Sequence, residues 1–193
     1  MSQTFNGLFC YFCKIETYME DIMGRKSTKE NKNIYQISRE KNNLTREQAS
    51  ELMEFVSPDR IEKIENEKSQ PHPDEILAMA KHYKTPMLCN YYCSQACPIG
   101  QQYVPTIPSK ELSQIVLEML ASLNSIDKRK NRLIEITADG EISDDELADF
   151  ATIQKELEQI SLIVDSLSLW IENTIASGKI DPEKLKETRE ELG

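Results

Sequence analysis

The sequence predicts an all-α protein in which an N-terminal domain of five short helices precedes a long antiparallel helical hairpin. Between residues 33 and 92, helix-start signals recur at short intervals, and a short apolar stripe follows each of them. Between residues 109 and 176, two much longer apolar stripes run with little interruption. The composition agrees, because glycine (6 residues) and aromatic residues (7%) are sparse while charged residues (29%) are plentiful.

The first two helices of the N-terminal domain are predicted from residue 33 onward. Ile34 and Ile37 lie three positions apart, which indicates one amphipathic helix that ends near Asn42. A second helix begins at Thr45, because Gln48 follows three residues later and the pair can form a capping box. The apolar stripe of this second helix consists of Ala49, Leu52 and Met53.

Three further short helices complete this domain. Ser57 caps the third helix and Pro58 takes its first position, where a missing backbone N–H costs nothing. Ile61 and Ile64 are predicted to face inward. A fourth helix begins at Pro73, and a short fifth helix lies within residues 85–93.

The second half of the chain predicts two long helices joined by a tight turn. One runs from Ser109 to about Ile136, and the other from Asp144 to about Ala176 with apolar residues every seven positions. Asp139-Gly140 makes the turn, and Ser143 with Glu146 forms a capping box. A calcium loop over residues 135–146 is a weaker alternative, since Glu135 and Thr137 replace two expected aspartates. A last helix begins after Asp181, at Pro182.

The second long helix is apolar over more than the width that one hairpin can cover. Something else must cover the surplus, and a second copy of the chain is the first expectation. Packing on the N-terminal domain is the alternative. The residues expected at the dimer interface are Leu162, Ile163, Leu169 and Trp170.

Charge is distributed unevenly along the chain, whose net charge is −10. Residues 109–193 contain ten basic and nineteen acidic residues, whereas residues 24–46 are basic. The basic residues of that short region are Arg25, Lys26, Lys29, Lys32, Arg39, Lys41 and Arg46. The sequence therefore predicts an extension and basic arm over residues 1–32, a domain over 33–100, a linker over 101–108 and an acidic hairpin over 109–193.

The stretch from Leu44 to Lys84 resembles the Xre class of helix-turn-helix DNA-binding domains, which includes Cro and the phage repressors. The matching features are Ile61, Ile64, Glu65, Pro73 and the "ILAMAKHY" stretch, and the resemblance covers about residues 33–92. The turn "MEFVS" is one residue longer than usual in that class. Where the class prefers a glycine after Glu65, we expect Asn66 to adopt the left-handed conformation.

The resemblance implies that the third helix lies in the major groove of double-stranded DNA. The class usually has glutamine where Arg46 stands, at a position that contacts a phosphate, and arginine can make the same contact with a charge added. On physical grounds, Arg60 could pair with guanine. The full set of expected DNA-contacting residues is Arg46, Ser57, Asp59, Arg60, Glu62, Lys63 and Asn66. The expected function is a sequence-specific, dimeric transcription regulator. A protein-interaction adaptor on the same fold is one alternative.

A thiol- or metal-responsive regulator that uses Cys89, Cys93 and Cys97 is a second alternative. Positions 89 and 97 on one helix would lie about 12 Å apart along its axis, too far to share one ion unless the chain unwinds near Pro98. His82, Cys10 or Cys13 could then supply a fourth ligand. The plainer interpretation is that the three cysteines are small buried residues.

Other classes of function find little support in the residues. The sequence has no glycine-rich phosphate loop, metalloprotease helix or nucleophile elbow, so we expect no enzyme and no cofactor. No apolar run approaches the ~20 residues that a membrane span needs. Residues 1–23 lack the features of a secretory signal, so a cytoplasmic protein with reduced thiols is expected.

Overall fold

A computed structural model of the chain describes residues 31–138 and 140–192, and within these ranges the fold is entirely helical. Of the predicted basic arm (Arg25, Lys26, Lys29 and Lys32), all but Lys32 lie outside the described residues, as do Cys10, Cys13 and Asp139. The chain divides into two compact units, residues 1–89 and residues 90–193. The division falls inside a helix, whereas the sequence places the linker at residues 101–108.

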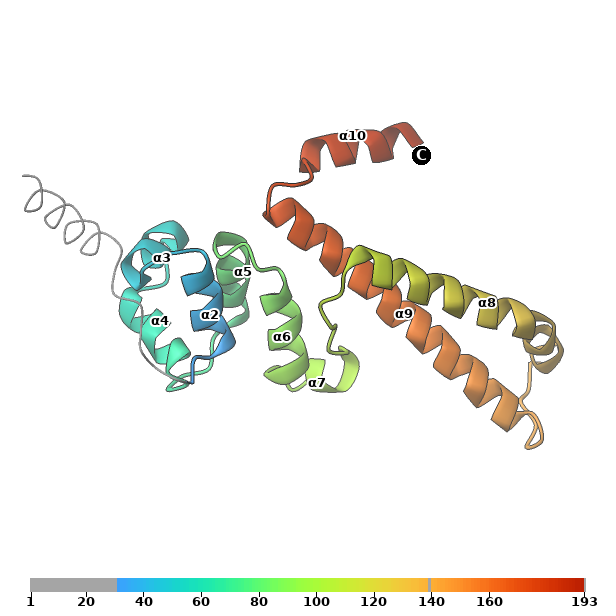
Figure 1. Ribbon diagram of the computed structural model, residues 1–193. Coiled ribbons are helices and arrows are strands. Elements are labelled where there is room, and N and C mark those ends of the chain that lie inside the picture. The colour runs from blue at the N-terminus through green and yellow to red at the C-terminus, as the bar shows by residue number, and fades with distance from the viewer. Residues whose placement is uncertain (1–30, 139, 193) are drawn as a thin grey trace, which may run out of the picture. The chain divides into compact units, whose positions relative to one another are not determined.

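Unit 1 is built from short helices that match the predicted ones. They are α2 (Ile34–Lys41), α3 (Arg46–Met53), α4 (Pro58–Glu65) and α5 (Pro73–His82), followed by the start of α6 (Met87–Gln95) (Figure 1). Helices α2, α3 and α5 pack against α4 or one another around a shared apolar core. The most deeply buried apolar residues of this core are Ala49, Met53, Val56, Ile61, Ile64, Ile76, Met79, Tyr83 and Leu88.

The local signals predict where these helices begin. Thr45 and Gln48 form the predicted capping box, and the Ser57 hydroxyl accepts a hydrogen bond from the Arg60 backbone N–H. The buried side of α2 differs from the prediction. Ile37 is 51% exposed, while Gln36 and Arg39 are buried. Hydrogen bonds to neighbouring helices, rather than apolar spacing, decide which side of α2 faces inward.

Three of the short helices end in the same way. The residue after each C-cap has a positive φ, and two backbone hydrogen bonds close the last turn. In α4 this residue is Glu67 (φ 58°), because Asn66 is the C-cap and has φ −94°. The expectation that Asn66 takes the left-handed conformation is therefore wrong by one position. Asn43 and Lys84 fill the same place after α2 and α5.

Unit 2 begins within α6 and continues through the four-residue α7 (Gly100–Tyr103) into the predicted hairpin. Gly100 lies directly against the preceding helix, because a Cβ atom at this position would be 2.0 Å from the Cys93 carbonyl oxygen. Only glycine permits such a close approach. The structure thus adds a short helix, α7, which begins at the last residue of the predicted domain and lies mostly in the predicted linker.

The hairpin consists of α8 (Leu112–Ile136) and α9 (Leu147–Ala176), which pack antiparallel along much of their length (Figure 1). Arg132 Nε donates to Asp149 Oδ2 (2.7 Å), and Ser125 Oγ donates to Glu156 Oε1 (2.7 Å). Residue numbers therefore rise along α8 as they fall along α9. Helix α10 (Pro182–Leu192) follows, with the Asp181 side chain accepting from the Glu183 N–H as expected at its start.

Helix α9 begins at Leu147, three residues later than predicted. The Glu146 carboxylate accepts from the backbone N–H and the hydroxyl of Ser143, so half of the predicted capping box forms. Residues 144–146 nevertheless form a turn, because the Glu146 N–H bonds to the Ser143 carbonyl oxygen. The turn after α8 contains Gly140 with φ 78°, a conformation that glycine adopts without strain.

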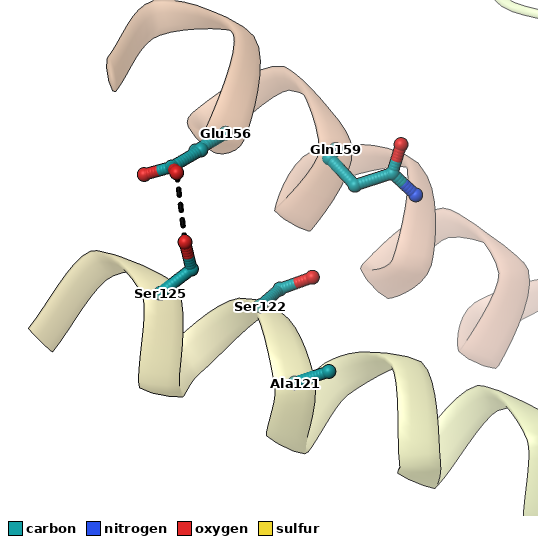
Figure 2. A pocket seen from close by; sticks show the side chains of 5 residues that line it. All are labelled: Ala121, Ser122, Ser125, Glu156 and Gln159. Atoms are coloured by element: carbon teal, nitrogen blue, oxygen red, sulfur yellow. Dashed lines mark hydrogen bonds between the residues drawn. The ribbon is translucent and has the colours of Figure 1, made fainter. Parts of the chain in front are cut away.

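A pocket of about 250 Å³ opens along one side of the hairpin. Figure 2 shows its lining, with the small side chains of Ala121 and Ser122 on α8 opposite Gln159 on α9. Glu156 closes one end through its hydrogen bond to Ser125. Small residues on α8 leave this space because their side chains do not reach across to α9.

Candidate nucleic-acid interface

The candidate interface is the exposed side of α4 together with the first turn of α3. Ile61, Ile64 and Glu65 hold the buried side of α4. Ser57, Asp59, Glu62 and Lys63 are exposed, and Asn66 is half-buried. Five of the seven predicted contact residues thus lie on or beside one accessible surface. Arg46 and Arg60 have additional partners inside the domain.

Glu65 is the centre of a buried ionic cluster behind α4. Its side chain is only 1% exposed, and it accepts two hydrogen bonds from Arg39, at 2.6 Å to Nε and 3.0 Å to Nη2. Arg39 Nη1 also donates to the carbonyl oxygen of Leu44 (2.6 Å). Burial alone would lower the pKa of Arg39, but the hydrogen bonds and charge of Glu65 raise it above its usual value. The pair links α2 to α4.

Arg46 joins the same cluster from the first turn of α3. Its Nε donates to Glu65 Oε2 (2.8 Å), and its Nη1 lies 4.0 Å from Glu62 Oε2. The Arg46 side chain is still 30% exposed. One edge of the guanidinium therefore positions α3 against α4, while the exposed part can meet a phosphate. The predicted phosphate contact remains a prediction, now with a fixed geometry.

Arg60 has a different environment from the one that the sequence suggests. Its Nε and Nη2 donate to the two carboxylate oxygens of Glu75 (2.6 and 2.8 Å), and Nη2 also donates to the Gln70 carbonyl oxygen (2.8 Å). Nη1 donates to the Ser69 hydroxyl. A bidentate pair of this kind is among the stronger protein hydrogen bonds. Arg60 therefore braces α4 against the start of α5, and its predicted pairing with guanine stays a prediction.

Glu75 completes this brace at the first turn of α5. Burial opposes ionisation of Glu75, but the hydrogen bonds from Arg60 and from the His72 backbone N–H outweigh it and lower the pKa of the carboxyl. Sequence reasoning missed both Glu75 and the role of Glu65 as an ion-pair partner. In the sequence, a glutamate at either position looks like a solvated helix residue, because the arginine that it pairs with lies far away along the chain.

Part of the positive charge expected around this surface is paired with an acidic side chain of the domain. Lys32, the one arm residue within the described range, donates to Glu40 on α2 (2.6 Å). Apolar side chains are exposed here too, since Leu52 in the last turn of α3 is 46% exposed and Phe55 in the turn before α4 is 61% exposed. Leu52 is therefore not part of the buried stripe that the sequence predicts for α3. Glu54, in the same turn, has φ 61°.

The three cysteines do not form a metal site in the part of the chain that the structure describes. Cys89, Cys93 and Cys97 are half-buried and form no disulfide with one another, and α6 contains only the first two. Across residues 31–138 and 140–192, no group of three or more histidine, cysteine, aspartate or glutamate side chains is arranged to hold an ion. The calcium loop is not supported there either, and its Asp139 is not described.

The comparisons with known proteins agree with the fold of unit 1. Residues 37–88 match the family model described as "Helix-turn-helix", which is of the Xre type. The resemblance stated for residues 33–92 is thereby confirmed over most of its length. Residues 37–88 form a helix-turn-helix domain in which α3 and α4 are the paired helices. No curated protein and no solved structure matches the chain.

The match extends over about a quarter of the chain and does not reach the hairpin. In the described residues, no helix combines the length and apolar character that crossing a membrane would require. The helix-turn-helix domain supports a DNA-binding regulator of the Xre type.

Proposed function

We propose that the protein is a sequence-specific, dimeric regulator of transcription that binds double-stranded DNA and acts by binding rather than by catalysis. The observation that carries the proposal is the exposed side of α4 within a matched helix-turn-helix domain. Two ionic clusters, around Glu65 and Glu75, hold this helix rigidly from behind. A regulator of this kind would act in the cytoplasm.

The first residues of α4 would enter the major groove. The Ser57 hydroxyl, which accepts from Arg60 N, can still donate to a base edge, and Lys63 can reach guanine or a phosphate. Arg46 would position the domain by a phosphate contact at the start of α3. Asp59 and Glu62 would repel the phosphates and so reduce the affinity for every DNA sequence. They would also exclude some bases from the positions that they face.

The test is gel-shift titration against a random pool of duplex DNA at low salt, with Lys63→Ala and Lys155→Ala as a matched pair. Both changes remove one exposed lysine, but Lys155 lies on α9 in unit 2. We expect Lys63→Ala to weaken binding about tenfold and Lys155→Ala to leave it unchanged. Asp59→Asn should strengthen binding to all sequences, because it removes a charge that repels phosphate.

A protein-interaction adaptor is the second candidate function, and the exposed Phe55 and Leu52 favour it. Exposed apolar side chains at the end of α3 and in the turn before α4 suit a protein surface better than a phosphate backbone. If the wild-type protein shifts no member of the DNA pool at low salt, the regulator proposal fails. Loss of partner binding in Phe55→Ser, with DNA binding absent in the wild type, would support the adaptor.

A further inference from the structure

The hairpin has an apolar side that nothing in the described chain covers. Val116 and Leu123 on α8 are 45% and 48% exposed, and Leu157 and Val164 on α9 are 48% and 46% exposed. Leu112, at the start of α8, is 38% exposed. These five residues define what we call the open face.

The five residues lie on the same side of the hairpin. Val116 directly follows the buried Ile115, and Val164 directly follows the buried Ile163. Each residue advances an α-helix by about 100° around its axis. On both helices the exposed residues therefore lie slightly more than a quarter-turn past the buried residues, in the same direction of rotation along the chain. Because α8 and α9 are antiparallel, the same sense of rotation brings both stripes to one side. The pocket of Figure 2 lies on the opposite side.

The open face lacks ionisable groups over most of its length. Along α8 from residue 112 to 126, the residues on this side are Leu112, Val116, Met119 and Leu123. Along α9 from residue 157 to 168, they are Leu157, Ser161, Val164 and Ser168. Glu158 and Asp165 lie only at the outer edge. In a region with nineteen acidic and ten basic residues, a side without charges indicates a surface that is kept for apolar contact.

The predicted dimer residues do not lie on this face. Ile163 is 1% exposed and Leu169 6% exposed, and Leu162 and Trp170 are half-buried. Side chains that the chain already covers have little surface to offer a partner. Helix α9 does have more apolar surface than the hairpin covers, as predicted, but the uncovered part lies on the open face and not at the four predicted residues.

We propose that a second copy of the chain packs on the open face and forms a four-helix bundle with a two-fold axis. The proposed function supplies only the expectation of a dimer, and the present inference rests on it for that and adds where the two copies meet. The uncharged stretch of the open face on α8, 15 residues or about 22 Å long, and the neighbouring part of α9 together span about 20 Å in width and present about 450 Å². That area lies at the small end of specific interfaces, below the ~800 Å² per partner of a standard one, so the dimer should be of modest affinity.

A second copy fits the chemistry of the open face better than a charged partner does. A two-fold axis sets the same apolar surface against itself, so leucine and valine meet leucine and valine. No charge has to be buried without a partner. A basic partner would instead be drawn to the acidic edges, where Glu158 and Asp165 lie.

The test is the mass of the full chain in solution, measured by size-exclusion chromatography with light scattering at micromolar concentration. The variants are Val116→Glu/Leu123→Glu and the control Leu117→Glu, whose side chain is 68% exposed but points away from the open face. We expect the wild type and Leu117→Glu to have twice the chain mass of 22.2 kDa. The double variant should have the single-chain mass with unchanged far-UV circular dichroism.

A second variant, Leu123→Ser/Leu157→Ser, introduces no charge and should show the same shift to single chains at lower concentration. A wild-type monomer would overturn the inference, and so would a dimer that survives both variants or is lost equally in Leu117→Glu. The DNA gel shift separates this inference from the proposed function. A double variant that still binds DNA, more weakly, leaves the regulator standing, whereas a wild-type dimer that binds no DNA retains the bundle and rejects the regulator.

Discussion

At the scale of single residues, the stability of unit 1 depends on two carboxylates that look like surface residues in the sequence. Glu65 holds Arg39 and Arg46, and Glu75 holds Arg60. Because Glu65 is 1% exposed and Arg39 8% exposed, their charges are removed from water. Removing one member of such a pair leaves the other buried and unpaired, which is far more costly than losing an exposed pair.

Glu65→Gln should therefore lower the free energy of unfolding of unit 1 by on the order of 3–5 kcal/mol. Arg46→Met should cost less than about 1 kcal/mol, since the Arg46 side chain is 30% exposed. Native-state hydrogen exchange of the α4 amides measures both changes within unit 1. Equal effects of the two substitutions would contradict the central role of Glu65.

Glu75 should contribute to an acid sensitivity of unit 1. Its pKa in the folded chain is lowered from the usual 4.5, so the unfolded chain takes up this proton first as the pH falls. The stabilisation is complete above pH 4.5 and disappears as the pH falls through the lowered value. We expect Glu75→Gln to flatten the decline of stability in acid, and Asp74→Asn, an exposed neighbour, to preserve it. Urea midpoints across this pH range check the prediction.

At the scale of elements, the ends of the short helices are less favourable than their beginnings. Thr45 and Ser57 cap α3 and α4 with standard side-chain hydrogen bonds. The left-handed positions after α2, α4 and α5 are filled by Asn43, Glu67 and Lys84. A Cβ atom makes this conformation costly for residues other than glycine and, to a lesser degree, asparagine.

Glu67→Gly should accordingly stabilise unit 1 by about 0.5–1 kcal/mol, because glycine adopts a positive φ without strain. Glu51→Gly, in the exposed interior of α3, is the matched control and should destabilise by about 1 kcal/mol. Denaturant unfolding followed by circular dichroism gives both values. Destabilisation by Glu67→Gly would show that the Glu67 side chain contributes more than its backbone conformation costs.

At the scale of the whole chain, one side of α9 is buried in unit 2 and another is exposed on the open face. Leu169 is 6% exposed and belongs to the core of unit 2, whereas Val164 is 46% exposed and lies on the open face. A substitution on one side should change folding, and a substitution on the other should change association.

Leu169→Ala should lower the stability of unit 2 by about 2–5 kcal/mol and leave the mass in solution unchanged. Trp170, the one tryptophan of the chain, provides a fluorescence signal from unit 2 during unfolding. If Leu169→Ala instead gave a stable folded monomer, Leu169 would belong to the interface after all.

Salt should act in opposite directions on the two proposed associations. DNA binding releases counterions from the phosphates, so it should weaken as salt is raised. Association of two acidic hairpins should strengthen, because salt screens the repulsion between them. Sedimentation and gel-shift titrations on one preparation, from low to physiological salt, measure both trends. A dimer that dissociates as salt rises would indicate that ion pairs, and not the open face, hold it together.

The sequence by itself determined the features that depend on neighbours in the chain. Thr45 with Gln48, Ser57 with Pro58, and Asp181 with Pro182 mark helix starts, and the heptad spacing of α9 marks a long helix. These signals act within one or two turns, so the printed residues contain them. The helix-turn-helix pattern around Ile61, Ile64 and Glu65 belongs to the same class of local information.

Only the tertiary structure decided which arginine side chains are already paired within unit 1 and which apolar side of the hairpin is left uncovered. Glu75 lies fifteen residues after Arg60, and Glu65 lies twenty-six after Arg39, so neither pair has a local signature. Periodicity shows that α9 is apolar on more than one side, but not which side the rest of the chain covers. That choice depends on contacts between distant segments, which is why Ile163 and Leu169 proved buried while Val164 stayed exposed.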